Sequence, residues 1–488
     1  MKGANALGKD GIMASLKGSS QDTINRLDHG VNGQEAMGIP MIVLTMGCRV
    51  NQFESATMGQ GGTGRGFRLV DAGQPAALVV INTCSVTSES DRQARQLIRR
   101  AVRDYPDSRI VVTGCYAQRA PEILADLPGV DLVLGNGEKS RLWELLAEMP
   151  PMPHHPVPGE DATSRVRVGN IADLTEMPDS IFLDHFGDRT RAFLHAQDGC
   201  DRACTYCLIP HVRGPSRSVP VARVMEQARR FIASGYEEIV LTGVDLGAYG
   251  RDLDGACSLA SLVRELLGLP GLGRLRISSV DPLDLDEAWI GLLADSDRLC
   301  GYLHLSIQSG DDGVRKRMGR GRGRQEVMRQ IARIRAARPD VVLGADFIVG
   351  FPSETEAAFA QTLELIAEAG LSLLHVFPYS ARPKTVAASW SRTLGIPADQ
   401  IRTRAQMVRQ AGATQWAEVA KLHLGRQELV LVESVEAGWG IGKTDGFLDM
   451  RFPQASVEWR GCLLPVTTVG LDAEKQTLIG RVNDEWVG

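Results

Sequence analysis

The chain has 488 residues, which is too long for one ordinary hydrophobic core and predicts two to four domains. Hydrophobic residues make up 43% and charged residues 23%, proportions that exclude a largely disordered protein, and no run of about eighteen apolar residues predicts a membrane span. The formal net charge of −5 excludes a uniformly basic surface, so a nucleic-acid partner would need a local basic patch.

Residues 1–40 lack the apolar core of a secretory signal, and they are too polar and too rich in glycine and serine to predict a packed segment. We therefore expect a disordered extension here and a protein that stays in the cytoplasm. Because thiols remain reduced in that compartment, the nine cysteines are expected to be metal ligands or buried thiols and not disulfides.

Strand-like and helix-like segments alternate in residues 41–150, which predicts a Rossmann-like α/β domain with a parallel sheet. Cys48, Cys84 and Cys115 follow the first three strand-like segments. The carboxyl ends of parallel strands share one edge of a sheet, so these cysteines can meet there. The alternative is three independently buried thiols. The expected strands are residues 41–47, 76–84, 108–115 and 130–136, and the clearest helix is residues 88–106.

A glycine-rich stretch follows the first of these cysteines. Gly59, Gly61 and Gly64 have the GxGxxG spacing of a dinucleotide loop, but they follow a helix-like segment instead of a strand, so we expect no nucleotide site. Each glycine lowers helix propensity by about 1 kcal/mol, which predicts a weakened helix beside Cys48.

Residues 151–190 begin with a proline-rich segment and predict a linker. His154 and His155 within it resemble a metal-binding pair. We expect them to be solvated instead, because no further ligand lies at a usable spacing.

Six strand-like segments separated by helix-like ones occupy residues 191–420, which predicts a partial (β/α)6 barrel because a complete one needs eight repeats. The expected strands are residues 192–199, 237–245, 274–281, 302–310, 342–350 and 371–380. Residues 421–488 change to short alternating segments punctuated by glycine and aspartate, which predicts a small all-β barrel. Its expected strands are residues 427–435, 447–452, 462–471 and 477–482.

Cys200, Cys204 and Cys207 form a CxxxCxxC motif after the first strand of the predicted partial barrel. Thiolates at short spacing select iron–sulfur clusters, zinc or copper(I). A structural zinc site normally has four ligands, and His211 is not expected to be the fourth because it follows a proline in a polar turn. Three thiolates on a 4Fe-4S cluster leave one iron open to bind a substrate or cofactor.

This motif resembles the defining element of the radical S-adenosylmethionine (SAM) superfamily. The resemblance implies that the three cysteines are catalytic, holding a 4Fe-4S cluster whose open iron chelates SAM for reductive cleavage. The segments LTGVDLG, SIQSG and FIVGFPSET agree with the same family. The residues that this resemblance implies as cofactor contacts are Tyr206, Gly243, Gln308, Ser309, Gly350 and Glu354.

The segments around Cys48, Cys84 and Cys115 resemble the amino-terminal domain of the methylthiotransferases, which carries an auxiliary 4Fe-4S cluster on three cysteines. GCRVNQFES, VRGPSRSVP, HVFPYSARP and VVTGCYAQ are most similar to the branch that modifies threonylcarbamoyladenosine beside the tRNA anticodon. The resemblance implies two clusters, two molecules of SAM and insertion of a methylthio group at C2 of that base. It also implies a tRNA substrate and an electron donor for the clusters; we expect a monomer with no membrane partner.

The carboxy-terminal segment resembles a TRAM domain, an OB-like RNA-binding module. Phosphate contacts are expected from basic residues in this module, beside the cysteine loop and in the basic run of residues 315–324. Solvated side chains without a ligand are the alternative for each. The residues are Arg213, Arg217, Arg320, Arg322 and Lys443.

Two alternatives to this function stay open. One keeps the chemistry and changes the substrate to isopentenyladenosine in tRNA or to an aspartate of a ribosomal protein. The other is a non-catalytic RNA-binding protein with structural zinc at either cysteine set. Cys257, Cys300 and Cys462 match no ligand spacing and are expected to be incidental thiols.

Overall fold

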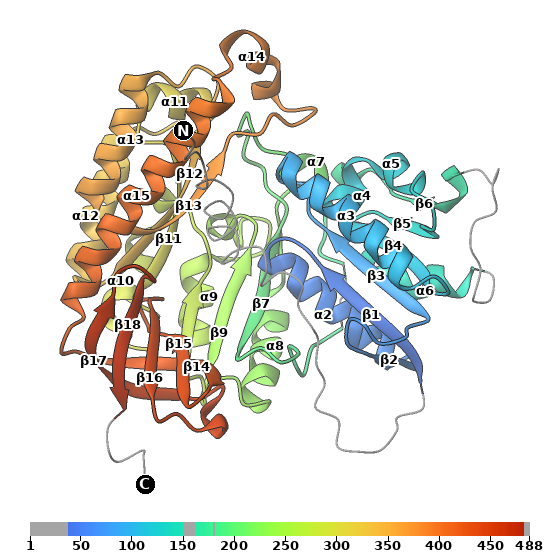
Figure 1. Cartoon of the computed structure of the whole chain (residues 1–488), viewed down its shortest axis with the longest axis horizontal. Helices are drawn as coiled ribbons and strands as arrows, with labels where there is room; N and C mark the ends of the chain where they lie inside the picture. The colour runs from blue at the N-terminus through green and yellow to red at the C-terminus, as the bar shows by residue number, and fades with distance from the viewer. Residues whose placement is uncertain (1–37, 150–161, 179–180, 483–488) are drawn as a thin grey trace, which may run out of the picture. The chain divides into compact units, whose positions relative to one another are not determined.

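The computed structural model describes residues 38–149, 162–178 and 181–482 (Figure 1). Nearly all of the predicted extension over residues 1–40, and both His154 and His155, lie outside the described residues. The chain divides into two compact units, each with its own apolar core. The amino-terminal unit is Met1–Ile171 with Pro178–Ile181, and the carboxy-terminal unit is Ala172–Met177 with Phe182–Gly488.

The amino-terminal unit is built on a six-stranded sheet whose strands all run parallel, in the order β2-β1-β3-β4-β5-β6. Every residue of β3 and β4 is buried, as expected for central strands covered by helices on both faces. The predicted Rossmann-like fold with a parallel sheet is confirmed. The strands are β1 Ile39–Thr45, β2 Phe67–Leu69, β3 Leu78–Thr83, β4 Arg109–Gly114, β5 Leu132–Leu134 and β6 Val166–Arg167.

Apolar layers cover both faces of this sheet. Alternate residues of β1 enter different layers: Ile42 lies in one apolar cluster with Ile98 of α3, and Met41 lies in another with Met58 of α2. Strand β6 comes from the segment that the sequence predicts as a linker, so part of that segment belongs to the sheet. The helices are α2 Arg49–Thr63, α3 Ser88–Asp104, α4 Cys115–Arg119, α5 Pro121–Ala125 and α6 Leu142–Ala147.

Helix α2 runs unbroken through the glycine-rich stretch, so the segment is neither a dinucleotide loop nor an interrupted helix. The reason lies in its packing. A Cβ atom on Gly62 would lie 2.5 Å from the sulfur of Met41 and 2.6 Å from the ring of Trp143. The glycines therefore give the Trp143 ring room to pack against the helix, which offsets their low helix propensity.

The carboxy-terminal unit contains the predicted partial barrel, and the prediction is confirmed. Strands β7, β9 and β10 pair in parallel, as do β11, β12 and β13. A parallel bridge between Val280 and Leu305 joins the two groups into a series of six. A short strand, β8, is antiparallel to β7. The strands are β7 Arg191–Asp198, β8 Arg217–Ser218, β9 Glu238–Gly243, β10 Arg274–Ile277, β11 Tyr302–Gln308, β12 Val342–Val349 and β13 Leu371–Pro378.

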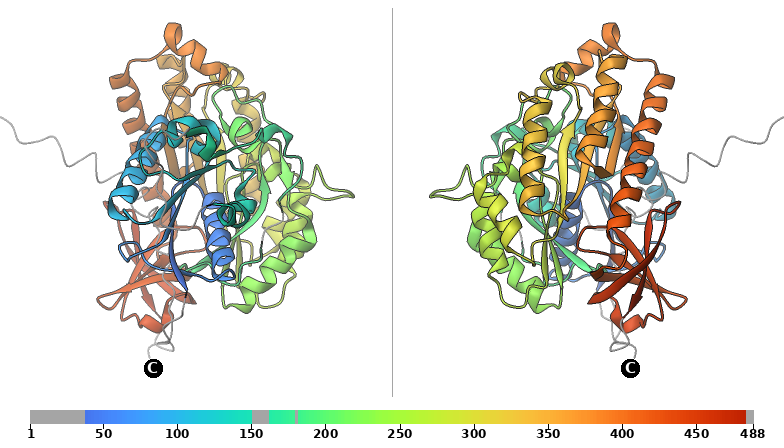
Figure 2. Two further views of the ribbon diagram at one scale, coloured as in Figure 1. Left: turned by 90° about the vertical axis from the view of Figure 1, so that its right-hand side faces the viewer. Right: turned by 90° about the vertical axis from the view of Figure 1, so that its left-hand side faces the viewer.

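Amphipathic helices cover the outer face of these strands (Figure 2). Helix α8, for example, buries Val224, Ala228 and Phe231 along one stripe. Helix α15 packs closely on β13, since a Cβ atom on Gly412 would lie 2.9 Å from Leu374. The helices are α7 Ile209–Arg213, α8 Val221–Ala233, α9 Leu259–Leu267, α10 Glu287–Asp295, α11 Asp312–Arg317, α12 Arg324–Ala337, α13 Glu356–Ala369, α14 Val386–Leu394 and α15 Ala398–Leu422.

The chain ends in a closed barrel of five strands in the order β14-β15-β16-β18-β17, which confirms the predicted small all-β fold. Strand β15 was not predicted, because its glycines hide the alternating pattern. Gly442 is required there, since a Cβ atom would lie 2.1 Å from the carbonyl oxygen of Leu431. The strands are β14 Gln427–Glu436, β15 Trp439–Lys443, β16 Asp449–Pro453, β17 Leu463–Asp472 and β18 Thr477–Val482.

A buried charge cluster joins this small barrel to the partial barrel. Glu238 is fully buried and accepts hydrogen bonds from Arg274 and Arg276 at 2.6 and 2.8 Å. Both arginines also donate to carbonyl oxygens of the small barrel and its loop. Those carbonyls belong to Leu429 and Lys443 for Arg274, and to Thr444 and Asp445 for Arg276.

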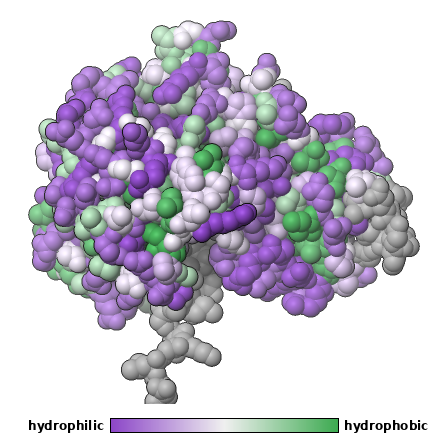
Figure 3. Space-filling model, turned by 90° about the horizontal axis from the view of Figure 1, so that it is seen from above, coloured by the Kyte–Doolittle hydropathy of each residue, from purple (hydrophilic) through white to green (hydrophobic). Residues whose placement is uncertain are grey.

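Hydrophilic residues dominate the face drawn in Figure 3, and hydrophobic ones gather there only in small separate groups. Among the described residues, no helix combines the length and the hydropathy that crossing a membrane requires.

Candidate active site

The CxxxCxxC loop is folded tightly by its own backbone. Gly199 has a φ of +69°, and a Cβ atom there would lie 1.8 Å from the carbonyl oxygen of Pro215, so only glycine fits. The N–H of Cys200 donates to Gly214 O at 3.1 Å, and the N–H of Cys207 donates to Cys204 O at 3.0 Å. The loop thus gathers the three predicted cysteines at the carboxyl end of β7.

Backbone N–H groups point at two of the three sulfur atoms. The Arg202 N–H donates to Cys200 Sγ and the Ile209 N–H to Cys207 Sγ, both at 3.4 Å. Burial, with the nearby Asp245 carboxylate, raises the pKa of the Cys200 thiol to about 12, and burial raises the pKa of Cys207 to about 11. A metal must therefore displace these protons, and the N–H groups are placed to stabilise the resulting thiolates as they do in iron–sulfur sites.

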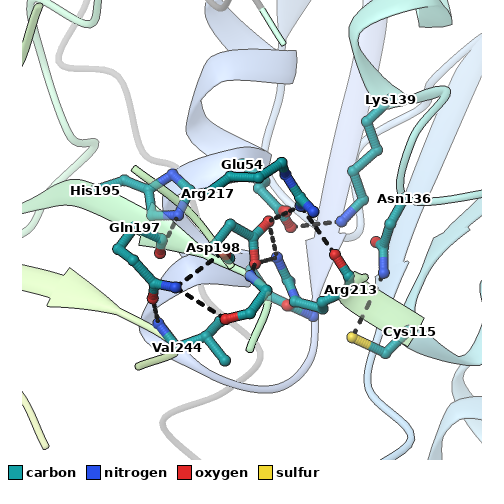
Figure 4. A network of polar contacts seen from close by, with 12 residues as sticks. Glu54, Cys115, Asn136, Lys139, His195, Gln197, Asp198, Arg213, Arg217 and Val244 are labelled. Carbon is teal, nitrogen blue, oxygen red and sulfur yellow. Dashed lines mark hydrogen bonds and ion pairs between the residues drawn. The ribbon is translucent and has the colours of Figure 1, made fainter. Parts of the chain in front are cut away.

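A buried glutamine near the end of β7, Gln197, supports the CxxxCxxC loop. Its Nε2 donates to the carbonyl oxygens of Asp198 and Gly199, both at 2.9 Å, and its Oε1 accepts from the N–H groups of Val244 and Asp245 at 3.0 and 2.6 Å. Figure 4 shows the side chain between these partners. One amide therefore fixes the cysteine loop to the loop that follows β9. Gln197 could not be identified from the sequence, because a glutamine inside a strand belongs to no motif.

An ion cluster beside the loop was also missed. Arg202, within the motif, bonds to Asp245 at 2.8 Å, to Asp281 at 3.2 Å and to Asp284. Asp284 has a raised pKa because it is buried, which Arg202 only partly offsets. A pocket of about 270 Å³ lies here, lined by Arg202, Asp245, Asp284 and neighbouring residues. The only available sequence signal was that acidic residues follow the second and third barrel strands.

Two of the predicted cofactor residues have unusual local backbone geometry. A Cβ atom on Gly243 would lie 2.8 Å from the Leu246 side chain and 3.1 Å from the carbonyl oxygen of Gln197, so a side chain does not fit at this position. Gln308 adopts a φ of +73° next to a register shift between β11 and β12. A strained non-glycine residue of this kind often marks a functional site, which agrees with the predicted role of Gln308.

The other predicted cofactor residues are engaged within the protein. Glu354 accepts from the Gly350 N–H at 2.8 Å and pairs with Arg404 at 2.7 Å, although burial still raises the pKa of its carboxyl. Tyr206 is partly buried, and its hydroxyl accepts from Arg320 at 3.3 Å. Ser309 is buried and accepts from the Asp311 N–H at 3.3 Å. Their contacts with a cofactor stay predictions.

Arg213 and Arg217, predicted to contact RNA, have fully buried side chains. Arg213 Nη1 lies 2.9 Å from Asp198, and Arg217 Nη2 lies 3.7 Å from the same carboxylate (Figure 4). Arg217 also donates to the carbonyl oxygens of Arg213 and Pro215 at 2.9 and 2.7 Å. These contacts assign both residues to the support of the cysteine loop and do not favour phosphate binding, so the RNA role stays a prediction.

The remaining predicted RNA contacts differ in exposure. Arg320 is nearly buried and bonds to Asp281 at 2.6 Å, because the basic run folds back onto the cysteine loop. Lys443 pairs with Asp449 at 2.6 Å and lies over the Phe447 ring. Arg322 is exposed. Of the five residues, Arg322 is the one whose surroundings best suit a phosphate contact.

The second cysteine set lies at the carboxyl edge of the amino-terminal sheet. Cys48 directly precedes α2 after β1, Cys84 follows β3, and Cys115 opens α4 after β4. These three strands are neighbours in the sheet, so the predicted meeting of the cysteines occurs. Burial raises the pKa of Cys84 to about 12, and the nearby Cys115 and Cys48 add to the rise.

Buried amides support this set as well. Asn51 Nδ2 donates to the carbonyl oxygens of Met46 and Thr83 at 2.8 and 3.1 Å, which ties the strand end before Cys48 to the one before Cys84. Asn136 Nδ2 lies 3.8 Å from Cys115 Sγ (Figure 4). Neither asparagine was identified from the sequence, although NQFES and LGN contain them.

The spacing of the sulfur atoms argues against zinc. Zn–S bonds of about 2.3 Å place tetrahedral sulfurs roughly 3.8 Å apart. In the part of the chain that the structure describes, neither cysteine set has all three sulfur atoms within 4.8 Å of one another. Three soft thiolates at wider spacing fit a cluster of several irons better than a single ion.

Comparisons with known proteins give independent information. A model of the Radical SAM superfamily matches residues 194–366, and a model described as uncharacterized protein family UPF0004 matches residues 41–135. The two matches cover the two cysteine sets separately. A solved structure of the radical SAM methyltransferase TsrM from Kitasatospora setae has a TM-score of 0.53 at 15% identity, over 72% of this chain and 77% of that chain, which shows a shared fold.

Several relatives that are similar over most of their length carry names of tRNA methylthiolation enzymes. Threonylcarbamoyladenosine tRNA methylthiotransferase MtaB of Rickettsia prowazekii is 38% identical over 84% of this chain and 90% of its own length. The protein of the same name from Bacillus subtilis is 39% identical over 70% of this chain and 74% of its own length. The tRNA-2-methylthio-N(6)-dimethylallyladenosine synthase of Cereibacter sphaeroides is 36% identical over 83% of this chain and 90% of its own length.

Proposed function

The chain belongs to the radical SAM methylthiotransferase family, and we propose that it inserts a methylthio group at C2 of threonylcarbamoyladenosine beside the anticodon of tRNA. The observation that carries the proposal is the second cysteine set on the amino-terminal sheet. A radical SAM enzyme that only abstracts a hydrogen atom needs one set, whereas sulfur insertion also needs a place that holds sulfur.

Two 4Fe-4S clusters and SAM, when bound, supply the one-electron chemistry and the methylthio sulfur, which no side chain of this chain provides. Cys200, Cys204 and Cys207 would hold one cluster. Cys48, Cys84 and Cys115 would hold the other. Each set offers three thiolates to a cluster of four irons, so each would leave one iron without a cysteine ligand.

The protein's own residues orient and enclose these groups. Gln197 and Asn51 fix the two cysteine sets to neighbouring backbone, and the Arg202 and Ile209 N–H groups stabilise thiolate charge. We propose that the backbone at Gly243, which has no side chain, and at Gln308, which has a positive φ, lies against SAM. Arg322 is our proposed phosphate contact. Arg213 and Arg217 support the cysteine loop, and Arg320 and Lys443 are paired with carboxylates of the protein.

The wider cellular setting is part of the same proposal. We propose that the enzyme works in the cytoplasm as a monomer and receives electrons from a separate donor. Relatives of similar identity are named for threonylcarbamoyladenosine and for dimethylallyladenosine, so the group on N6 of the adenine is what distinguishes the two substrates.

Iron content and product analysis test the proposal together. The wild-type protein, reconstituted without oxygen, should hold about eight irons, and a Cys200, Cys204, Cys207 triple alanine variant about four. The matched triple alanine variant at Cys48, Cys84 and Cys115 should also hold about four. Mass analysis of nucleosides should then find the methylthio product with threonylcarbamoyl-modified tRNA and wild-type protein only. Stoichiometric zinc, or a different methylthiolated base, would contradict the proposal.

A further inference from the structure

Two histidines and an aspartate form a cluster on three adjacent strands of the partial barrel. His304 Nε2 of β11 lies 2.9 Å from Asp346 Oδ1 of β12, and His375 Nδ1 of β13 lies 3.2 Å from the same oxygen. Within the described residues, this is the group whose three donor atoms all lie within 4.8 Å of one another. The proposed chemistry of the cysteine sets does not use it.

The cluster lies on the inner face of the partial barrel. Side chains alternate along a strand, so Gly344, Asp346 and Ile348 of β12 share one face. A Cβ atom on Gly344 would lie 2.8 Å from the His304 ring, whereas α15 packs against Leu374 on the other face of β13. Ile348 packs against the same apolar cluster as Tyr206 of the cysteine loop. This inner face therefore leads from the histidines toward the CxxxCxxC loop.

The cluster is open at one side. The His375 side chain is 63% exposed and Phe377, two residues further along the same face, is 40% exposed. The His304 side chain, by contrast, is only 4% exposed, and its Nδ1 bonds to the Tyr302 hydroxyl at 2.7 Å. A rigid, buried histidine thus holds Asp346, and Asp346 in turn orients an accessible histidine.

Asp346 and His375 each keep one atom that can still hydrogen-bond to a ligand. Burial alone would raise the pKa of Asp346, but the two histidines outweigh it and lower that pKa below its usual value, so the carboxylate is ionised. His375 must then carry its proton on Nδ1 to donate to it, which leaves Nε2 directed away from the cluster. Within the described residues, both histidines contact Asp346 through Oδ1, so Oδ2 can accept from an N–H or O–H group of a ligand.

The relatives named above differ in what their substrate adenine carries on N6. A dimethylallyl group is apolar, whereas a threonylcarbamoyl group has a urea, a hydroxyl and a carboxylate. Enzymes that share the C2 chemistry must therefore differ where the N6 group lies, and only the polar group requires hydrogen-bonding partners. The inner face near the cysteine loop is where such partners would be needed.

We propose that Asp346 and His375, held by His304, form the binding site for a polar N6 substituent of the substrate adenine. This inference rests on the proposed function and adds the residues that select the base. His375 Nε2 accepts a hydrogen bond from the hydroxyl of the substituent, and Asp346 Oδ2 accepts one from its urea N–H. The exposed Phe377 ring, whose centroid lies 6.4 Å from that of His375, supplies an adjacent apolar surface.

A single divalent metal ion is the competing occupant. Two histidines and one carboxylate are a ligand set that iron, zinc or manganese accepts. Both N···O distances, however, are ordinary hydrogen-bond lengths, and both histidines contact one carboxylate oxygen. The cluster is therefore satisfied without an ion, which favours the hydrogen-bonding role.

The test compares His375→Leu with His185→Leu, which makes the same change at an exposed histidine outside the cluster. Anticodon stem-loops carrying threonylcarbamoyladenosine or dimethylallyladenosine are bound to each protein, and methylthiolation is measured with both. His375→Leu should raise Kd and KM for the threonylcarbamoyl RNA about 10- to 100-fold with little change in kcat. Binding of the dimethylallyl RNA should not weaken. Asp346→Asn should act in the same direction, and His185→Leu should match wild type.

Three outcomes would overturn the inference. The first is that His375→Leu weakens binding of both RNAs equally, or of neither. The second is that wild-type protein with both clusters loaded holds one further divalent metal ion, which His375→Leu loses. The third is that wild-type protein prefers the dimethylallyl RNA. A wild-type protein that methylthiolates neither RNA contradicts the proposed function instead, and the binding comparison still tests the role of the cluster.

Discussion

The two cysteine sets are assembled in opposite ways. Cys200, Cys204 and Cys207 lie within one loop, so their closeness in sequence and the backbone hydrogen bonds around that loop bring them together. Cys48, Cys84 and Cys115 come from three strand ends, and the order of strands in a parallel sheet brings them together. The loop set therefore starts from residues that are close in sequence, whereas a site on several strand ends exists only while the sheet is intact.

Both sets nevertheless share one device, a buried side-chain amide bonded to main-chain atoms. Gln197 joins the cysteine loop to the next strand end, and Asn51 joins two strand ends of the sheet set. An amide is suited to this because it both donates and accepts, and the low dielectric of the interior strengthens each bond.

Single cysteine replacements should separate the roles of the two sets most strongly. Cys204→Ala should abolish both 5'-deoxyadenosine formation from SAM and methylthiolation. Cys84→Ala should abolish methylthiolation while 5'-deoxyadenosine formation persists, because the first set remains complete. Both products are measured by chromatography and mass analysis. Cys462→Ala, at an exposed thiol, is the control. Loss of 5'-deoxyadenosine formation in Cys84→Ala would show that the two sets do not act separately.

Acid should distinguish the units that carry the two sets. Burial by itself would raise the pKa of Glu238, but Arg276, Arg191 and Arg274 outweigh it and hold that pKa well below its usual value. Because the folded-state pKa is below the unfolded value of about 4.3, this contribution to stability is complete above that pH and is lost as the pH falls further. Thermal unfolding recorded from neutral pH downward should show a stability loss in the carboxy-terminal unit there.

Glu238→Gln gives the matching variant. Removal of this buried charge leaves its arginine partners uncompensated and should lower the free energy of unfolding by about 3–5 kcal/mol at neutral pH. The variant should also lose part of the acid dependence. Glu226→Gln, in an exposed pair with Arg230, should change stability by less than about 1 kcal/mol. Equal effects of the two replacements would refute the role assigned to the buried cluster.

The same contrast explains what the sequence predicted and what it did not. The loop set was evident from its spacing. The sheet set was predicted from the position of each cysteine at a strand end together with the resemblance of the three segments to methylthiotransferases. Gln197, Asn51 and the Arg202 ion cluster were missed because their function arises from partners distant in sequence. The continuity of helix α2 was not predicted for a related reason. Glycine lowers the intrinsic helix propensity of the segment, but in the folded protein the glycines leave space for the Trp143 ring.

The two supporting amides, Asn51 and Gln197, can be replaced separately. Asn51→Leu removes two hydrogen bonds to buried carbonyl oxygens and should cost about 2–3 kcal/mol in the amino-terminal unit. It should reduce iron at the sheet set to below one cluster and leave 5'-deoxyadenosine formation intact. Gln197→Leu should do the reverse, reducing iron at the loop set. Iron analysis with the product assay measures both. Identical losses in the two variants would mean that the amides stabilise the whole chain instead.

The glycines of α2 provide the smallest and most local test. Gly62→Ala gains up to about 1 kcal/mol of helix propensity, but its Cβ atom would overlap Met41 and Trp143, a strain of about 1–3 kcal/mol. A net loss of up to about 2 kcal/mol is therefore expected from thermal or denaturant unfolding. Gly64→Ala is the matched control, since its nearest neighbours would be 3.9 Å away and its φ of −65° suits alanine. It should leave stability unchanged or raise it. If Gly62→Ala instead stabilised the protein as much as Gly64→Ala, the Trp143 contact would not be the reason for the glycines.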